Sequence, residues 1–125
     1  MFGLKYIYGE LIRREGEDPL DFPALMKNPS EYEIVVTNAL TGLPQYYGRE
    51  MMKQDDYRLI MASSAIPVAC HPVKLNGVPY FDGGLTDAIP VRRALGQGCD
   101  KLVVILSKNR DYVRKPQGMR RLYRR

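Results

Sequence analysis

The pair Asn76-Gly77 constrains the fold more strongly than any other feature of this sequence, because it separates two short runs of alternating apolar residues. Both central residues of a two-residue hairpin turn need a positive φ, which asparagine and glycine tolerate. The sequence therefore predicts a β-hairpin centred on this pair. Pro79 follows in the second arm and has no amide proton. It predicts that this arm lies at a sheet edge or leaves one position unpaired.

The rest of the chain alternates between helical and strand patterns. Apolar spacing predicts helices over residues 2–14, 22–28, 57–65 and 90–98. The first helix should face the core with Leu4, Ile7, Tyr8 and Leu11. The third should face it with Tyr57, Ile60, Met61 and Ser64. Strands are predicted over 34–37, 42–50 and 101–107, the last buried on both faces. This alternation predicts an α/β layered fold.

Length and composition limit the class of protein. A chain of 125 residues is enough for one domain and too short for two. No apolar run approaches the roughly 20 residues of a membrane-spanning helix, and the charged, aromatic N-terminus does not resemble a signal peptide. Two cysteines without a CxxC pair, and one histidine, give neither a disulfide framework nor a zinc signature. We therefore expect a cytoplasmic protein without a metal site.

The net charge of +5 is concentrated at the C-terminus. Residues 108–125 hold eight Lys or Arg against the single acid Asp111, whereas residues 1–107 hold eleven against thirteen acids. The sequence predicts that 108–125 form a basic helical or flexible tail. Such a tail is a solvated helix, a segment that faces an acidic partner in a larger protein, or a contact with an anionic membrane surface. No nucleic-acid-binding motif accompanies it, so we expect no nucleic-acid partner.

Asp82 is the strongest candidate for a functional residue, because it lies between the hairpin and the pair Gly83-Gly84. Two glycines allow left-handed backbone angles and let another group approach closely. A carboxylate at the carboxyl end of a strand is where α/β folds usually place ligands. The structural alternative is that Asp82 caps the turn or the helix that follows.

Several strings of the sequence together resemble one known family. These are ASSAIP (62–67), Pro72-Val73, the long run over residues 76–106 and NALTG (38–42). They closely resemble the C-terminal half of the patatin-like phospholipase domain, with the likeness running from about residue 30 to 107.

The resemblance implies a three-layer α/β/α sandwich that hydrolyses acyl esters of lipids with a serine-aspartate dyad and needs no cofactor. In such a dyad the aspartate of a D-G-G motif takes the proton of a serine held in a G-x-S-x-G elbow. By match to that motif, Asp82 would be the dyad base, and Gly83 and Gly84 the turn that presents it. The substrate would be an acyl lipid or phospholipid.

The serine elbow itself is absent from the sequence. None of the four serines, Ser30, Ser63, Ser64 and Ser107, has glycine two residues before and two after it. Ser63 and Ser64 lie in a helix-like run without the glycines of a strained elbow, so neither is expected to replace it. We therefore expect residues 1–107 to be the C-terminal part of a patatin-like domain that is inactive alone, a fragment or truncated gene product.

Two further candidates and one rival function remain. Cys70-His71 lacks the third and fourth ligands of a metal site at suitable spacing. Asp87 precedes the helix that starts near Pro90 and is expected to cap it. The rival to the hydrolase is a non-catalytic module that self-associates into a homo-oligomer or binds an anionic surface, since strands without their partners invite self-association.

Overall fold

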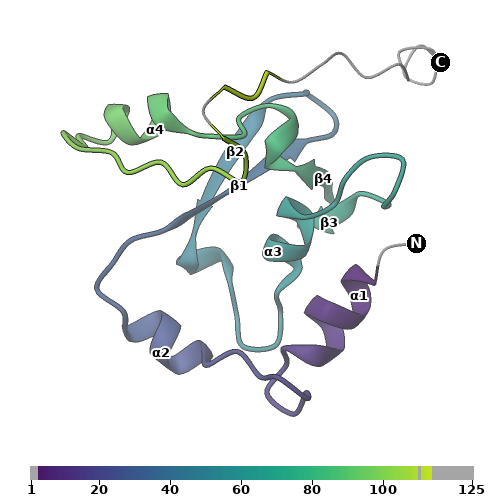
Figure 1. Ribbon diagram of the computed structural model, residues 1–125. Coiled ribbons are helices and arrows are strands. Elements are labelled where there is room, and N and C mark those ends of the chain that lie inside the picture. The colour runs from purple at the N-terminus through teal and green to yellow at the C-terminus, as the bar shows by residue number, and fades with distance from the viewer. Residues whose placement is uncertain (1–2, 110, 114–125) are drawn as a thin grey trace.

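A computed structural model describes residues 3–109 and 111–113, and its centre is a four-stranded antiparallel sheet (Figure 1). The strands lie in the order β2-β1-β4-β3. Their bounds are β1 Glu33–Asn38, β2 Pro44–Gly48, β3 Val73–Leu75 and β4 Val78–Asp82. The two hairpins β1-β2 and β3-β4 therefore join through the long-range pairing of β1 with β4.

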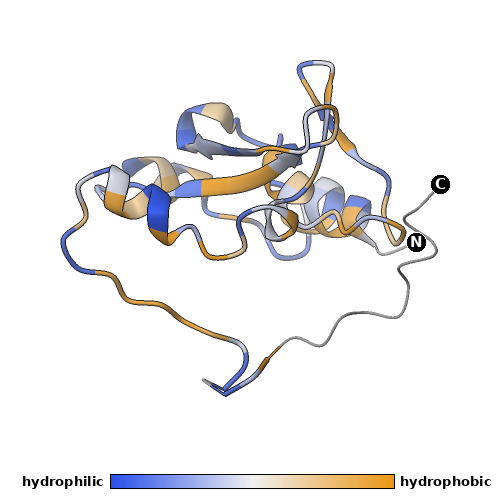
Figure 2. Cartoon of the chain, turned by 90° about the horizontal axis from the view of Figure 1, so that it is seen from above, coloured by the Kyte–Doolittle hydropathy of each residue, from blue (hydrophilic) through white to orange (hydrophobic). Residues whose placement is uncertain are grey.

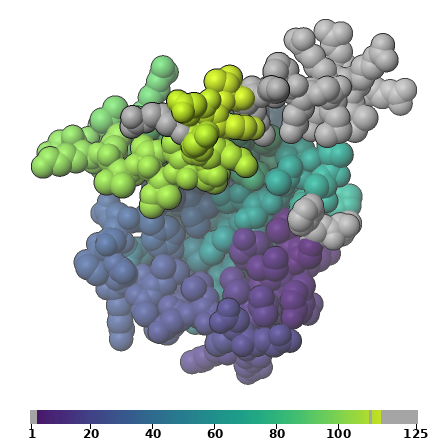
Figure 3. Space-filling model, in the orientation of Figure 1, coloured from purple at the N-terminus to yellow at the C-terminus, as the bar shows by residue number. Residues whose placement is uncertain are grey.

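Short helices surround this sheet. They are α1 Leu4–Tyr6, which continues as the π-helical segment η1 Ile7–Leu11, then α2 Phe22–Lys27, α3 Arg58–Ser63 and α4 Val91–Gly96. Two 3₁₀ turns, η2 Arg49–Met51 and η3 Gly83–Leu85, complete the order. Helix α3 contacts β1, β3 and β4. Figure 3 shows the N-terminal helical segment in purple packed against the teal part of the chain that contains α3, in agreement with the contact between η1 and α3.

The core lies between α3 and the sheet. Its buried members come from β1, β3, β4, α3 and the segment before α3: Val36, Met52, Tyr57, Leu59, Ala62, Leu75 and Tyr80. Val36 and Ala62 are fully inaccessible to solvent. Because these residues are far apart in the sequence, their packing joins the two hairpins and the helix into one unit.

The structure confirms the predicted mixed helix and strand fold and its hairpin. Leu75 pairs with Val78, so the turn between β3 and β4 has two residues. Those residues, Asn76 and Gly77, have φ values of 49° and 84°. Both lie in the left-handed region, as a type I′ turn requires.

Of the two alternatives predicted for Pro79, the sheet edge is wrong, because β4 lies between β1 and β3. The other, a position left unpaired, fits the structure, because the pairing of β4 with β1 stops at Tyr80. The proline is tolerated for a local reason. The ladder between β1 and β4 ends where Asn38 pairs with Tyr80, and the Pro79 carbonyl then accepts a hydrogen bond of 2.9 Å from the Ala39 amide. The Pro79 carbonyl therefore has a hydrogen-bond partner at the point where β1 and β4 stop pairing.

Two predicted helix faces differ from those observed. In α3 the buried residues are Leu59 and Ala62, which the prediction did not include. Of the predicted row, Tyr57 at the N-cap is buried and Ile60 packs against the core, whereas Met61 and Ser64 are only half-buried. In the first helix, the Ile12 amide bonds to the Ile7 carbonyl, five residues back, at 3.2 Å. This wider π-helical turn shifts the inward row, so Ile7 is 38% exposed while Ile12 packs against the core.

The prediction of a buried strand over 101–107 is also wrong. The segment is not a strand, and Val103 and Ile105 are 92% and 94% exposed. Figure 2 shows it as a hydrophobic stretch of chain set apart from the sheet. The segment lies beside α4, with which it lines a shallow hollow. A strand inside a sheet needs hydrogen-bonded strands along its two edges, and its two faces must be covered by other elements. The described residues supply no neighbouring strand for it.

The predicted basic tail falls largely outside the described residues, which exclude 110 and 114–125. Within the part of the chain that is described, no helix is long and apolar enough to cross a bilayer.

Candidate functional site

Asp82 ends β4 and begins the turn η3, and its main chain is fixed on both sides. Its amide donates a hydrogen bond of 2.9 Å to the carbonyl of Ala65, just after α3. Its carbonyl accepts one of 2.8 Å from the hydroxyl of Thr37 in β1. Thr37 is buried, and its hydroxyl also lies 2.9 Å from that of Thr86. The backbone of Asp82 is therefore held by a helix end and by a neighbouring strand.

The carboxylate of Asp82 is held by the turn that follows it. Its Oδ1 atom accepts a hydrogen bond of 2.7 Å from the Gly84 amide, so Asp82 is the N-cap of η3. This contact matches the structural alternative of a capping aspartate. Within the described chain, no hydrogen bond engages the other oxygen, Oδ2. A capping role thus occupies one carboxylate oxygen and leaves the second available.

Gly83 is required by close packing rather than by its backbone angles. A Cβ atom at this position would lie 2.3 Å from the carbonyl oxygen of Val35 in β1. Neither Gly83 nor Gly84 has a positive φ, so the expectation of left-handed angles at this pair is wrong, whereas the expectation of close approach is met. Only glycine lets β1 and the turn after Asp82 come this near.

A solvent-open hollow of about 350 Å³ lies beside this turn. Its lining comes from the start of β1, one side of α3, the Asp82-Gly83-Gly84 turn and Asp87-Ala88. A cavity of this size is at the lower end of the range for small-molecule sites. Asp82 therefore stands at the wall of a space that can admit part of a ligand.

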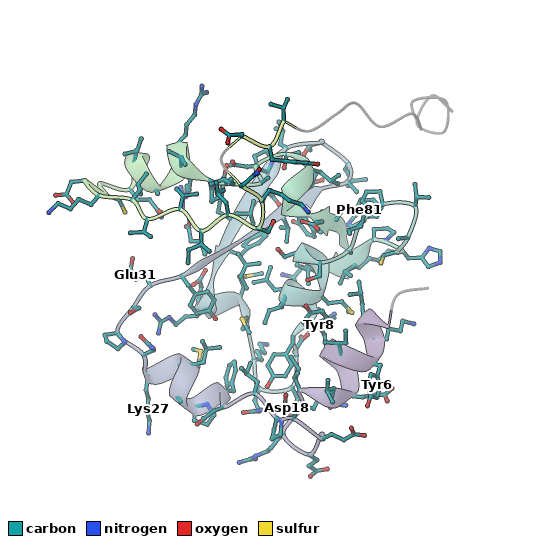
Figure 4. All side chains as sticks on the ribbon, viewed as in Figure 1. Tyr6, Tyr8, Asp18, Lys27, Glu31 and Phe81 are labelled. Atoms are coloured by element: carbon teal, nitrogen blue, oxygen red, sulfur yellow. The ribbon has the colours of Figure 1, made fainter. Side chains whose placement is uncertain are left out.

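Ser63 and Ser64 also line the hollow, but both hydroxyls are engaged in structural hydrogen bonds. The Ser63 hydroxyl donates to the Val35 carbonyl at 2.8 Å. The Ser64 hydroxyl bonds to the Ile60 carbonyl at 3.1 Å and lies 3.0 Å from the phenol oxygen of Tyr8. Figure 4 shows Tyr8 pointing inward from η1. Each serine thus ties α3 to a neighbouring element.

The family of the chain follows from comparison with known proteins. Residues 6–95 match the family model of the patatin-like phospholipases, and this range contains the whole Asp82-Gly83-Gly84 turn. The chain belongs to the patatin-like phospholipase family. The matched range starts and stops earlier than the resemblance in the sequence suggested. The four-stranded sheet with its flanking helices is consistent with part of an α/β patatin-like domain.

One curated relative shows how much of a longer protein this chain covers. The uncharacterized protein YjjU of Escherichia coli (strain K12) is 44% identical over 73 residues, which is 58% of this chain and 20% of that protein. The patatin-like chain thus spans about a fifth of the length of this relative. No solved structure matches it.

The prediction that Asp87 caps the last helix of this patatin-like chain is wrong. Helix α4 has Pro90 at its N-cap and no side-chain cap. Asp87 instead accepts a hydrogen bond of 2.5 Å from the Tyr46 hydroxyl, and this bond raises the pKa of Tyr46 because the phenol proton is held by the carboxylate. The contact joins β2 to the segment after η3.

A second polar cluster joins Tyr46, Arg93 and Glu33. The Arg93 guanidinium lies 5.0 Å above the Tyr46 ring and donates two hydrogen bonds to Glu33, at 2.9 and 2.5 Å. The hydrogen bond from Arg93 lowers the pKa of Glu33. The cluster attaches α4 to the start of β1, where Glu33 lines the hollow.

Sequence reasoning missed Thr37 as a supporting residue of the Asp82 turn. Thr37 has no distinctive signal in the sequence, because a hydroxyl residue at the end of an apolar run is common. Ala65 also supports Asp82, through its carbonyl, and lies in the ASSAIP string that carried the family resemblance. Cys70 is half-buried and His71 exposed, and no group of three or more metal-binding side chains is found in the described part of the chain.

Proposed function

We propose that the complete protein hydrolyses fatty-acyl esters of lipids or phospholipids, with Asp82 as the general base of a serine-aspartate dyad. The observation that supports this most is the position of Asp82 at the end of β4. Three hydrogen bonds fix the residue, and one carboxylate oxygen remains available beside the hollow. A base held in a fixed direction is what proton transfer from a nucleophile requires.

The proposed chemistry uses one carboxylate for the proton transfers of both half-reactions. The base takes the hydroxyl proton of a serine as its oxygen attacks the ester carbonyl, and returns the proton to the departing alcohol. In the second half-reaction the same carboxylate takes a proton from the water that attacks the acyl-serine ester. It then returns this proton to the departing serine oxygen, and the fatty acid is released. The Gly83-Gly84 turn keeps the carboxylate in place, while the oxyanion donors and the serine lie outside these 125 residues.

The domain division of the sequence is part of the same proposal. Residues 1–107 would form the C-terminal part of the catalytic domain and complete their sheet against strands that carry the serine elbow. The 125-residue chain would then show no esterase activity above background. The basic tail, 108–125, would bring the protein to an anionic membrane surface, so binding to anionic vesicles should weaken as salt is added.

The test compares matched variants of the complete protein on a short-chain nitrophenyl ester. Asp82→Asn should lower kcat by at least about a hundredfold, the lower range for loss of a general base, with unchanged circular dichroism. Asp87→Asn, a control at another acid that lines the hollow, should retain activity. An active Asp82→Asn protein would leave Asp82 a capping role only. Turnover by the 125-residue chain that disappears with Asp82→Asn would refute its predicted inactivity.

The second candidate function is a non-catalytic module that self-associates. The exposed apolar segment around Val103 and Ile105 favours it, because exposed strand-forming segments pair readily with other chains. Under this proposal the chain elutes as an oligomer, and the double substitution Val103→Glu/Ile105→Glu converts it to a monomer. A wild-type chain that is monomeric at high concentration would count against this function.

A further inference from the structure

A second pocket of about 370 Å³ lies between α1, α3 and β3, and it shares no lining residue with the hollow beside Asp82. Its walls are formed by apolar side chains from three separate elements: Leu4 of α1, Met61 of α3, and Pro72-Val73 at the start of β3. The pocket can therefore take up a ligand without involving the Asp82 turn.

The polar groups of this pocket carry one sign of charge. Lys5, Arg58 and Lys74 line it, and no aspartate or glutamate does. The charge of Arg58 is balanced, because its guanidinium donates to both oxygens of Asp56 at 2.7 and 2.6 Å. No salt bridge involves Lys5 or Lys74 among the described residues. Both lysines are solvent-exposed, so their charges stand at the mouth of an apolar space.

We propose that this pocket binds a single-chain fatty-acid carboxylate, with its tail against Met61 and Val73 and its carboxylate between Lys5 and Lys74. An apolar wall favours an alkyl chain, because burial removes its surface from water. Two ammonium groups at the mouth give charge-assisted hydrogen bonds to a carboxylate. A cationic amphiphile would meet like charge, and an uncharged alcohol would gain only the apolar contribution. The proposal concerns binding and is independent of the proposed catalysis.

The pocket volume limits the length of the ligand. About 370 Å³ lies near the lower end of the size range of small-molecule sites. Each methylene buried in such a site should raise affinity about fourfold until the apolar wall is covered. A series from hexanoate to dodecanoate should thus show a rise in affinity that levels off within the series.

The two cysteines provide a direct test on the 125-residue chain. Cys70 lines the pocket and is half-buried, whereas Cys99 is exposed and lies elsewhere. Decanoate, used below its micelle concentration, should slow alkylation of Cys70 severalfold and leave the rate at Cys99 unchanged, as followed by peptide mass spectrometry. An unchanged Cys70 rate, or equal slowing at both cysteines, would overturn the proposal.

Charge variants test the role of the lysines. The double substitution Lys5→Glu/Lys74→Glu should abolish protection of Cys70 by decanoate, and Lys101→Glu/Lys108→Glu, the same charge change outside the pocket, should leave it intact. Lys5 and Lys74 are both exposed, and far-ultraviolet circular dichroism verifies the fold of their double variant. Decanol should protect Cys70 at least tenfold more weakly than decanoate. Equal protection by decanol, or full protection in Lys5→Glu/Lys74→Glu, would show that these lysines do not recognise the carboxylate.

Discussion

The main-chain amide of Asp82 donates a hydrogen bond of 2.9 Å to the carbonyl oxygen of Ala65. This bond attaches the end of β4 to the end of α3. Ala65 is fully buried, so the contact is shielded from competing water. The candidate base therefore belongs to the rigid part of the molecule, and substitutions that disturb its turn should be detectable as losses of stability.

Gly83 should tolerate replacement poorly. In Gly83→Ala the new Cβ would meet the Val35 carbonyl oxygen at 2.3 Å, so β1 and the turn must separate. We expect a loss of more than about 2 kcal/mol in the free energy of unfolding, measured by urea denaturation. The control is Gly96→Ala at the end of α4, where a Cβ meets nothing within 4 Å. Equal stabilities of the two variants would contradict the close approach.

Thr37 should stabilise the Asp82 turn through its hydroxyl. Thr37→Val keeps the shape of the side chain but removes the hydrogen bond to the Asp82 carbonyl, leaving a buried acceptor unpaired. We expect a loss of about 1–2 kcal/mol in unfolding free energy. Thr86→Val removes the other hydroxyl of the pair from an exposed residue, and should cost less. A Thr37→Val protein as stable as wild type would show that the hydroxyl has no structural role.

Tyr80 should make the fold sensitive to high pH. Its burial, together with the hydrogen bond to Tyr47, raises the pKa of Tyr80 to about 12. In the unfolded chain the phenol ionises near pH 10, below the pH at which it ionises in the folded protein. Ionisation between these two pH values therefore favours the unfolded state. The contribution of neutral Tyr80 is complete below pH 10 and is lost as the pH rises toward about 12.

Urea denaturation at pH 9, 10 and 11 measures this effect. The wild-type protein should lose more stability over this range than Tyr80→Phe, which has no ionisable group at this position. Tyrosinate absorbance of the folded proteins provides a second reading, because the component that titrates latest should be missing from Tyr80→Phe. Parallel loss of stability in the two proteins would contradict the assignment.

Val68 should be a site of backbone strain that can be relieved. Its φ of 72° lies in the left-handed region, which is unfavourable for a β-branched residue, and its side chain is 66% exposed. Val68→Asn should raise the unfolding free energy by about 1 kcal/mol, since asparagine tolerates this conformation. The control is Val103→Asn, at a residue without a positive φ that is 92% exposed. A similar gain in unfolding free energy in both variants would show that replacing an exposed valine, and not relief of strain, causes the effect.

Local signals in the sequence predicted most of the elements before residue 100. Asn76-Gly77 specifies its hairpin because the turn depends only on the conformations that two residues tolerate. The alternation of helices and strands, and the string that ends in Asp82-Gly83-Gly84, were enough for the fold class and the family. The predicted faces of two helices were only partly right, because a π-helical turn and the position of the sheet decide which side is buried.

The sequence by itself thus determined the hairpin, the α/β class and the residues of the D-G-G turn. Only the tertiary structure decided what holds Asp82, because Thr37 and Ala65 reach it from distant parts of the chain. It also decided why Gly83 is glycine, and that residues 101–107 do not form the strand their composition favours. The physical reason is the same in each case. Hydrogen-bond partners and close contacts of a sheet come from other segments, and no local pattern specifies which segments meet.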